Sequence, residues 1–295
     1  MAATLAERLG YAADARIAIV HCDDMGLSPA TTRGGFDVLT RGVGTCGSAM
    51  VPCPDFPQVA ALARAHPELD LGVHLTLNAE WPRCRFGPVA GADAVPTLVD
   101  ADGFLWRTPG EVLARGRIEE VELELRAQVE RARDAGIDVT HLDAHMGTAL
   151  LPPLLDVYVR LALDTRLPVF AVRANAAALD RLGGAAAAAS VARALAALEA
   201  AGVPILDGFD ADSLHFAPGD GAAHNRARLA RLGPGVSYLI CHPARADDAF
   251  RAMASDAHAR EFEHAFYAGD AARRVLEAEG IQTLGMRQLR ALMRS

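Results

Sequence analysis

Short apolar runs alternate with longer amphipathic stretches along most of this chain. Apolar runs that end at glycine, proline or a polar cluster are typical of buried strands, whereas apolar residues at every third or fourth position are typical of helices. The pattern predicts eight strands, at residues 17–22, 47–51, 69–77, 139–143, 168–172, 204–206, 235–241 and 281–284.

Helical periodicity follows most of these strands. The predicted helices cover residues 30–40, 56–65, 118–135, 152–163, 175–201, 222–232, 256–279 and 286–293. Strands and helices in alternation are typical of a parallel sheet with helices packed against it. The pattern favours an α/β fold built as an irregular (β/α) barrel, and a doubly wound open sheet is the alternative. Neither nucleotide-binding glycine motif is present.

Residues 78–108 interrupt this alternation. The segment has no strong periodicity and contains three prolines and both tryptophans, Trp81 and Trp106. A long irregular stretch inside a compact domain is more often functional than filler. We therefore interpret residues 1–295 as one domain, in which residues 78–108 form an insertion that covers a site.

Charge and composition exclude several classes of partner. The 295 residues carry a formal net charge of −8, from 29 basic and 37 acidic residues, which argues against nucleic acid. No apolar run reaches the roughly 18 residues that a membrane span needs, and the start of the chain lacks the apolar segment of a secretory signal. We therefore expect a cytoplasmic protein. The five cysteines form no CxxC pair, so neither a disulfide framework nor a thiolate zinc site is indicated.

Polar residues gather where the predicted strands end. A parallel barrel brings the carboxyl ends of its strands to one rim, where such folds build their active sites. Two imidazoles and one carboxylate are typical of an open divalent-metal site, in which a water takes the remaining position. The pattern therefore predicts a metal site on this rim. The residues at the strand ends are Asp23, Asp24, His74, His145, Arg173, Asp207 and His242.

The acidic pair and two of the histidines also have purely structural interpretations. Asp23 and Asp24 precede Ser28, so the pair is equally consistent with an acidic cap on the next helix. His74 could be a histidine of the core, and His242 could simply end its strand before a proline.

The segment HLDAH contains two further histidines around an aspartate. His145 lies nearer the end of its strand and is the better ligand, while Asp143 can orient a ligand imidazole. His141 lies deeper, and we interpret it as a structural or supporting residue. We interpret His21, inside the first strand, in the same way.

Four segments resemble the motifs of the YdjC-like carbohydrate deacetylases, the family that includes chitooligosaccharide deacetylases. The segments occur in the family's order and span residues 17–248; they are IVHCDDMGLS, LGVHLTLN, HLDAHMGTALLPP and LICHPARADD. The resemblance implies a barrel like that of the polysaccharide deacetylases and a bound divalent metal.

The resemblance also implies roles for single residues. The metal ligands would be Asp24, His74 and His145. Asp23 would be the general base and His242 the general acid. Arg173 matches an arginine near the family's site more loosely, and we expect it to bind substrate.

Three positions depart from the family pattern. Met25 replaces phenylalanine, Ala144 replaces serine, and Met146-Gly147 replaces Gln-His after the ligand histidine. The second histidine of that motif is therefore missing. If it binds sugar in the family, this chain takes a different substrate from chitooligosaccharides.

The expected reaction is hydrolysis of an N-acetyl group on a sugar or oligosaccharide. The cofactor would be one divalent ion, zinc or magnesium, with Asp23 taking a proton from water and His242 protonating the departing amine. Two alternatives stay open: a metal-containing protein that binds carbohydrate without turnover, and another metal-dependent hydrolase such as a phosphoesterase. The expected partner is a small acetylated sugar, with no nucleic acid and no membrane, and the sequence leaves a homodimer open.

Overall fold

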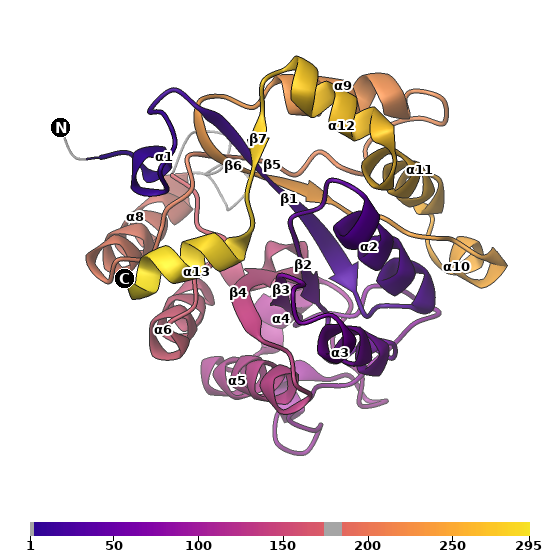
Figure 1. The fold of residues 1–295 in the computed structure, drawn as a ribbon. Coiled ribbons are helices and arrows are strands. Elements are labelled where there is room, and N and C mark those ends of the chain that lie inside the picture. The colour runs from indigo at the N-terminus through magenta and orange to yellow at the C-terminus, as the bar shows by residue number, and fades with distance from the viewer. Residues whose placement is uncertain (1–2, 174–184) are drawn as a thin grey trace.

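The computed structural model describes residues 3–173 and 185–295. Seven strands of these residues form one parallel sheet in the order β4-β3-β2-β1-β6-β5, with β7 paired to β1 (Figure 1). The strands are β1 (Arg16–Met25), β2 (Cys46–Ala49), β3 (Leu71–Leu75), β4 (Val139–Ala144), β5 (Gly208–Asp210), β6 (Gly235–Cys241) and β7 (Gln282–Thr283).

The sheet curls, because its two edges are linked through the segment that the sequence predicted as a strand at 168–172. Two single parallel bridges, Leu142–Val169 and Val172–Leu206, join this segment to β4 on one side and to the residues just before β5 on the other. The prediction of an α/β fold with a parallel sheet is confirmed. The described residues form a curled sheet, part of a barrel, in which the segment at 168–172 is not a full strand.

Helices surround the sheet (Figure 1). They are α1 (Leu5–Arg8), α2 (Pro29–Arg41), α3 (Phe56–Ala65), η1 (Pro96–Leu98), α4 (Pro109–Arg115), α5 (Ile118–Asp134), η2 (His145–Leu150), α6 (Leu155–Thr165), α8 (Ala185–Ala200), α9 (Gly221–Ala230), α10 (Asp248–Met253), α11 (Ala257–Ala268), α12 (Asp270–Ala278) and α13 (Met286–Arg294).

Two further predicted elements differ from the structure, and a third is described only in part. The single helix predicted at 256–279 is wrong, because Gly269 takes an extended backbone and divides it into α11 and α12. The strand predicted at 204–206 lies later in the chain, as β5. Of the helix predicted at 175–201, the part before Ala185 lies outside the described residues. None of the described helices combines the length and the apolar character needed to cross a membrane.

The start of α2 decides one of the alternatives left open by the sequence. Ser28 is its N-cap, and the Ser28 hydroxyl accepts a hydrogen bond from the Thr31 backbone N–H at 3.3 Å. Pro29 occupies the first turn, where its missing N–H costs nothing. Because Ser28 already caps the N-terminus of α2, Asp23 and Asp24 are not needed as caps of this helix.

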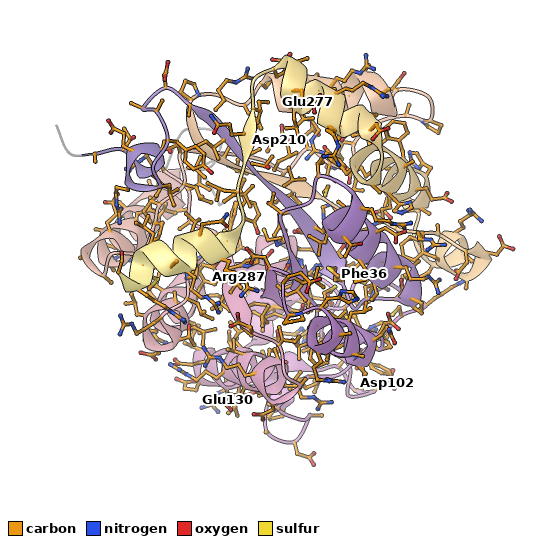
Figure 2. All side chains as sticks on the ribbon, viewed as in Figure 1. Phe36, Asp102, Glu130, Asp210, Glu277 and Arg287 are labelled. Carbon is orange, nitrogen blue, oxygen red and sulfur yellow. The ribbon has the colours of Figure 1, made fainter. Side chains whose placement is uncertain are left out.

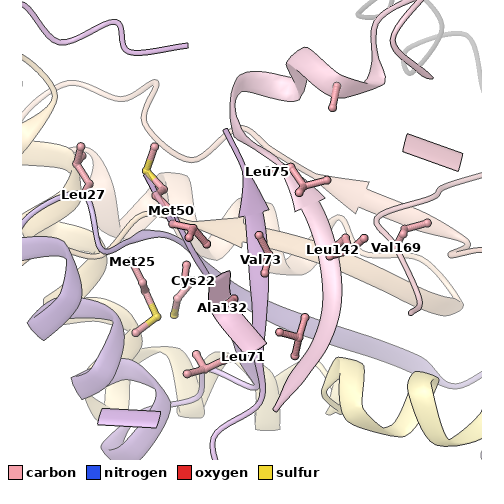
Figure 3. Packing of buried hydrophobic residues seen from close by; sticks show 14 of the residues in the cluster. Cys22, Met25, Leu27, Met50, Leu71, Val73, Leu75, Ala132, Leu142 and Val169 are labelled. Carbon is pink, nitrogen blue, oxygen red and sulfur yellow. The ribbon is translucent and has the colours of Figure 1, made fainter. Parts of the chain in front are cut away.

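The core lies between the sheet and its helices. Leu71, Val73 and Leu75 of β3 pack with Leu142 of β4 and Ala132 of α5, all of them buried (Figure 3). Charged side chains such as Glu130 and Glu277 lie on the outside (Figure 2). This packing holds the carboxyl ends of β1, β3, β4 and β6 together, which is where the polar residues gather.

Candidate functional site

A β-bulge at the end of β1 directs two adjacent carboxylate side chains toward the same cavity. Neighbouring residues of a regular strand point to opposite faces of the sheet. Here the register with β2 shifts between Cys22 and Met25, and Asp24 has a left-handed backbone with φ of 61°. Bulges of this kind re-aim side chains beside active sites. As a result both Asp23 and Asp24 line the same cavity.

Asp24, His74 and His145, which we call the rim triad, converge from β1, β3 and the end of β4. Asp24 Oδ1 lies 3.4 Å from His74 Nε2 and 3.3 Å from His145 Nδ1. One ligand atom from each residue lies within 4.8 Å of the others, and all three residues are buried. Asp24 Oδ1 and His74 Nε2 have no hydrogen-bond partner among the described residues. Two buried polar atoms without partners, aimed at one point, indicate that a ligand belongs there.

Supporting residues orient each member of the rim triad. Asp143 Oδ1 accepts a hydrogen bond from His74 Nδ1 at 2.9 Å, Glu80 contacts His145 Nε2 at 2.9 Å, and Arg260 donates to Asp24 Oδ2 at 2.7 Å. Carboxylates behind metal-binding imidazoles fix the tautomer and direct the free nitrogen toward the metal. This is the role expected for Asp143 from the sequence.

Neighbouring charges shift the pKa values of all three residues of the rim triad. Burial opposes ionisation of Asp24, but the guanidinium of Arg260 and the two imidazoles hold the pKa of Asp24 well below its usual range. Burial also opposes protonation of His145, yet Glu80 and Asp24 raise the pKa of His145 to about 9. The pKa of His74 is raised as well, against the effect of burial, chiefly by Asp143 and Asp23. The carboxylates around the rim triad thus favour positive charge at this point, which protonated imidazoles or a bound cation can supply.

These residues fit a divalent metal. One carboxylate and two imidazoles are a donor set that zinc and related ions accept, with room for water. The free buried atoms point to one place, and each imidazole has its support on the opposite nitrogen. The rim triad is the ligand set that the resemblance implied.

Asp23 is contacted by His21, which in turn contacts His141. We call these two buried histidines the inner pair. Asp23 Oδ1 lies 2.5 Å from His21 Nδ1, and His21 Nε2 lies 3.1 Å from His141 Nε2. His141 Nδ1 continues to Thr140 Oγ1 at 2.9 Å. Asp23 Oδ2 stays free to face the site, 3.9 Å from His74 Nε2.

His242 lies across the site from the rim triad. Its Nε2 is 3.6 Å from Asp23 Oδ2, and its Nδ1 is 2.8 Å from the Ser213 hydroxyl. Because Ser213 donates its own proton to Glu263, His242 Nδ1 is the donor toward Ser213. Burial lowers the pKa of His242 to about 4. A neutral His242 thus presents an unprotonated Nε2 to Asp23.

Two cavities meet at this site. The first, the polar cavity, has a volume of about 580 Å³ and is walled by the rim triad together with Trp81, Asp256 and Arg260. The second, the apolar cavity, has a volume of about 460 Å³. Both are lined by Asp23, Met146 and His242, so these three residues stand at their junction.

The structure does not bring every residue of the predicted rim into the site. Arg173 is exposed and pairs with Glu199 at 3.2 Å and with Asp207 at 3.5 Å. Neither Arg173 nor Asp207 is among the described residues that line the two cavities. Substrate binding by Arg173 stays a prediction.

Two residues of the site, Glu80 and Arg260, were not predicted from the sequence. Glu80 lies in the irregular segment directly after β3, and an acid close behind a strand that carries a histidine was the available signal. Arg260 comes from α11, far along the chain, and reaches Asp24 only in the folded protein. No local pattern distinguishes Arg260 from the other arginines of the helices.

Comparison with known proteins covers nearly the whole chain. The sequence model of the YdjC-like protein family matches residues 17–278. A carbohydrate deacetylase of Geobacillus stearothermophilus is 32% identical over 235 residues, which are 79% of this chain and 81% of that protein. A carbohydrate deacetylase of Thermus thermophilus is 40% identical over 163 residues, which are 55% of this chain and only 56% of that protein.

A solved structure shares the fold. It is a protein of Enterococcus faecalis V583, provisionally described as a cellobiose-phosphate cleavage protein, with a TM-score of 0.75 at 24% identity. The superposition covers 93% of this chain and 99% of that one. With the family match over residues 17–278, these findings show that the chain belongs to the YdjC-like protein family.

Proposed function

We propose that this protein is a metal-dependent carbohydrate N-deacetylase, which removes an N-acetyl group from an acetylated sugar. The observation that carries the proposal is the convergence of free, buried donor atoms in the rim triad beside a carboxylate, Asp23, that takes no part in it. The deacetylases among the relatives support the reaction class.

Asp24, His74 and His145 would hold the metal. A divalent ion bound there would supply a lowered pKa for a water and polarisation of an acyl carbonyl. The two imidazole donors favour zinc, whereas magnesium prefers oxygen ligands. The Asp24 side chain also neutralises Arg260, so one carboxylate serves both a buried cation and the ligand set.

Asp23 is the proposed general base. His21 Nδ1–H occupies Asp23 Oδ1, which leaves Oδ2 as the atom that faces the reacting water. The attack on the amide carbonyl forms a C–O bond, and collapse of the tetrahedral intermediate breaks the C–N bond. A positioned base of this sort typically contributes about 10²–10⁴-fold to the rate.

His242 is the proposed general acid, and its low pKa shapes how it acts. An imidazole with a pKa of about 4 is neutral near pH 7, so it must gain its proton during the reaction. Asp23 Oδ2 lies 3.6 Å from His242 Nε2 and is the nearest proton donor once it has taken the water's proton. His242 would then pass that proton to the departing amine.

The test combines metal analysis with turnover. Purified protein is assayed for bound metal, and release of free amine from a panel of N-acetylated sugars is measured before and after chelation. We expect one ion per chain, loss of turnover on chelation, and recovery on adding zinc. Asp23→Asn should lower kcat at least about 100-fold while the metal stays bound.

Asp102→Asn is the matched control, because Asp102 is exposed and far along the irregular segment. Wild-type turnover by Asp23→Asn would show that the base is misassigned. Saturable sugar binding without any released amine would instead favour a binding protein, and two ions per chain would favour a phosphoesterase.

A further inference from the structure

The apolar cavity is too large for the methyl group of an acetyl substrate. Its volume is about 460 Å³, and cavities of roughly 300–1,000 Å³ hold complete drug-sized ligands. It opens at Asp23 and His242, the residues that would handle protons on either side of the scissile amide. Whatever fills it is therefore attached to, or lies next to, the reacting bond.

The walls of this cavity are hydrocarbon and aromatic. They come from the turn after β4, from α6 and α8, from the segment at 168–172, and from β6. Six of the lining residues are Leu151, Leu155, Phe170, Leu195, Leu198 and Ile240. A pocket lined in this way binds an apolar group, because each buried methylene strengthens binding by about fourfold.

Tyr238 indicates that the cavity is a binding site and not a defect of packing. Its ring stacks on His21 with centroids 4.8 Å apart and contacts Phe170 edge-on at 5.1 Å. The Tyr238 hydroxyl is buried and has no hydrogen-bond partner among the described residues. Buried hydroxyls in a completed core are paired. The space beside Tyr238 is therefore not a completed core.

The two cavities divide a substrate by polarity. The polar cavity carries Glu80, Asp256, Arg260 and the ring of Trp81, which suit the hydroxyl groups and the apolar face of a sugar. The apolar cavity is mostly hydrocarbon, and its polar side chains are Asp23, Asp143, Tyr238 and His242. The amide must lie between them, at Asp23 and His242, so the sugar occupies the polar side and the acyl group the apolar side.

We propose that the substrate is an N-acyl sugar whose acyl chain is longer than acetyl and occupies the apolar cavity. This proposal rests on the proposed function, since it uses the same site and the same hydrolysis. Water adds to the carbonyl carbon, the C–N bond breaks, the amine takes a proton, and a fatty acid leaves. Met146, at the junction of the cavities, contacts the start of the chain.

The experiment compares substrates that differ only in chain length. Release of glucosamine from N-acetyl-, N-butanoyl- and N-octanoyl-glucosamine is measured with the metal-loaded protein. We expect kcat/KM to rise with chain length, by at least about tenfold from acetyl to octanoyl. Octyl N-acetylglucosaminide serves as the comparison in which the apolar chain sits on the sugar instead.

A matched pair of variants on α8 tests the location. Ala194 is buried in the wall of the cavity, whereas Ala197 lies one turn along on the exposed face of the same helix. Ala194→Phe fills the cavity and should lower the octanoyl-to-acetyl ratio of kcat/KM at least tenfold, an effect of the size that pocket blocking gives. Ala197→Phe should leave this ratio unchanged. Ala194→Leu, a smaller change, covers the case in which the phenylalanine variant fails to fold.

The outcomes separate the two proposals. Release of glucosamine from the acetyl substrate alone, with no effect of Ala194→Phe on it, overturns the long-chain proposal and leaves the deacetylase intact. A preference for the octyl glycoside that Ala194→Phe abolishes also overturns it, because the sugar side then occupies the cavity. No release from any substrate overturns the proposed function itself, and the long-chain proposal with it.

Discussion

The rim triad and the inner pair are two neighbouring clusters that contain buried histidines. They differ in which of their polar atoms have hydrogen-bond partners. In the rim triad, Asp24 Oδ1 and His74 Nε2 have none among the described residues. In the inner pair every ring nitrogen has a contact: His21 reaches Asp23 and His141, and His141 reaches Thr140. Yet His21, His141 and Cys46 also lie close enough together to hold a metal.

The difference teaches that proximity alone does not define a metal site. A hydrogen bond between two imidazoles satisfies both nitrogens, so the inner pair has no need of an ion. Burial raises the pKa of the Cys46 thiol well above its usual value, so in the absence of a metal this thiol stays protonated. We therefore expect the rim triad to bind a cation and the inner pair to support Asp23.

Metal affinity is where the two clusters should differ most. His141 lies in β4 and His145 directly follows it, four positions later, and each can be changed to glutamine. His145→Gln removes a ligand and should weaken zinc binding more than about 100-fold, beyond the 10–100-fold cost of losing a supporting residue. His141→Gln should keep one zinc per chain. Elemental analysis and calorimetric titration measure both.

Two results would break this comparison. If the wild-type protein holds two zinc ions per chain and His141→Gln holds one, the inner pair is itself a metal site. If His145→Gln binds zinc with undiminished affinity, the rim triad is not the ligand set. Circular dichroism of both variants shows whether the fold is retained.

Turnover should reveal the role of the inner pair, which metal affinity does not report. His21 holds Asp23 through its Nδ1–H at 2.5 Å, and an asparagine amide can place an N–H close to the same point. His21→Leu should lower kcat by about 10–100-fold with little change in KM, because the base loses its orientation. His21→Asn should recover most of that loss. Equal losses in the two variants, or a change confined to KM, would show that His21 does not orient Asp23.

Periodicity predicted the scaffold well wherever a segment's own pattern decides its structure. The helix at 56–65 and the strand at 235–241 have the predicted bounds, because each is a regular run with clear stops. It failed at Gly269, where helical periodicity continues on both sides of a break. The segment at 168–172 looks like a strand in the sequence but forms only single bridges.

The candidate site was predicted from strand ends, and its geometry was not. Alternation along β1 would point Asp23 and Asp24 in opposite directions, and only the bulge against β2 brings them together. Arg260 reaches Asp24 from α11, a contact between residues far apart in the chain. Register shifts and long-range pairs depend on how elements pack, which a single sequence does not display.

The smallest effect is expected at an exposed ion-pair cluster, whose contribution to stability should depend on pH. Asp138 pairs with Arg290 and Arg287 near the chain's end, and its side chain is 55% exposed. Arg290, and to a smaller extent Arg287, hold the pKa of Asp138 below its usual range against the effect of burial. A lowered pKa in the folded state stabilises the fold above the ordinary aspartate pKa, and this stabilisation is lost as the pH falls through the lowered value.

Asp138→Asn should therefore lower the free energy of unfolding at pH 7 by less than about 1 kcal/mol, the usual range for exposed ion pairs. The difference from wild type should shrink as the pH falls below about 4, where the aspartate becomes protonated in the unfolded chain and then in the folded one. Urea unfolding of both proteins between neutral and acid pH measures it. High salt should reduce the difference at pH 7, because exposed charges are screened. A difference in unfolding free energy that stays constant across this pH range would mean that Asp138 stabilises the fold by packing and not by charge. The Asp138 cluster, like the inner pair, would then contribute through its packing and hydrogen bonds and not through its charge.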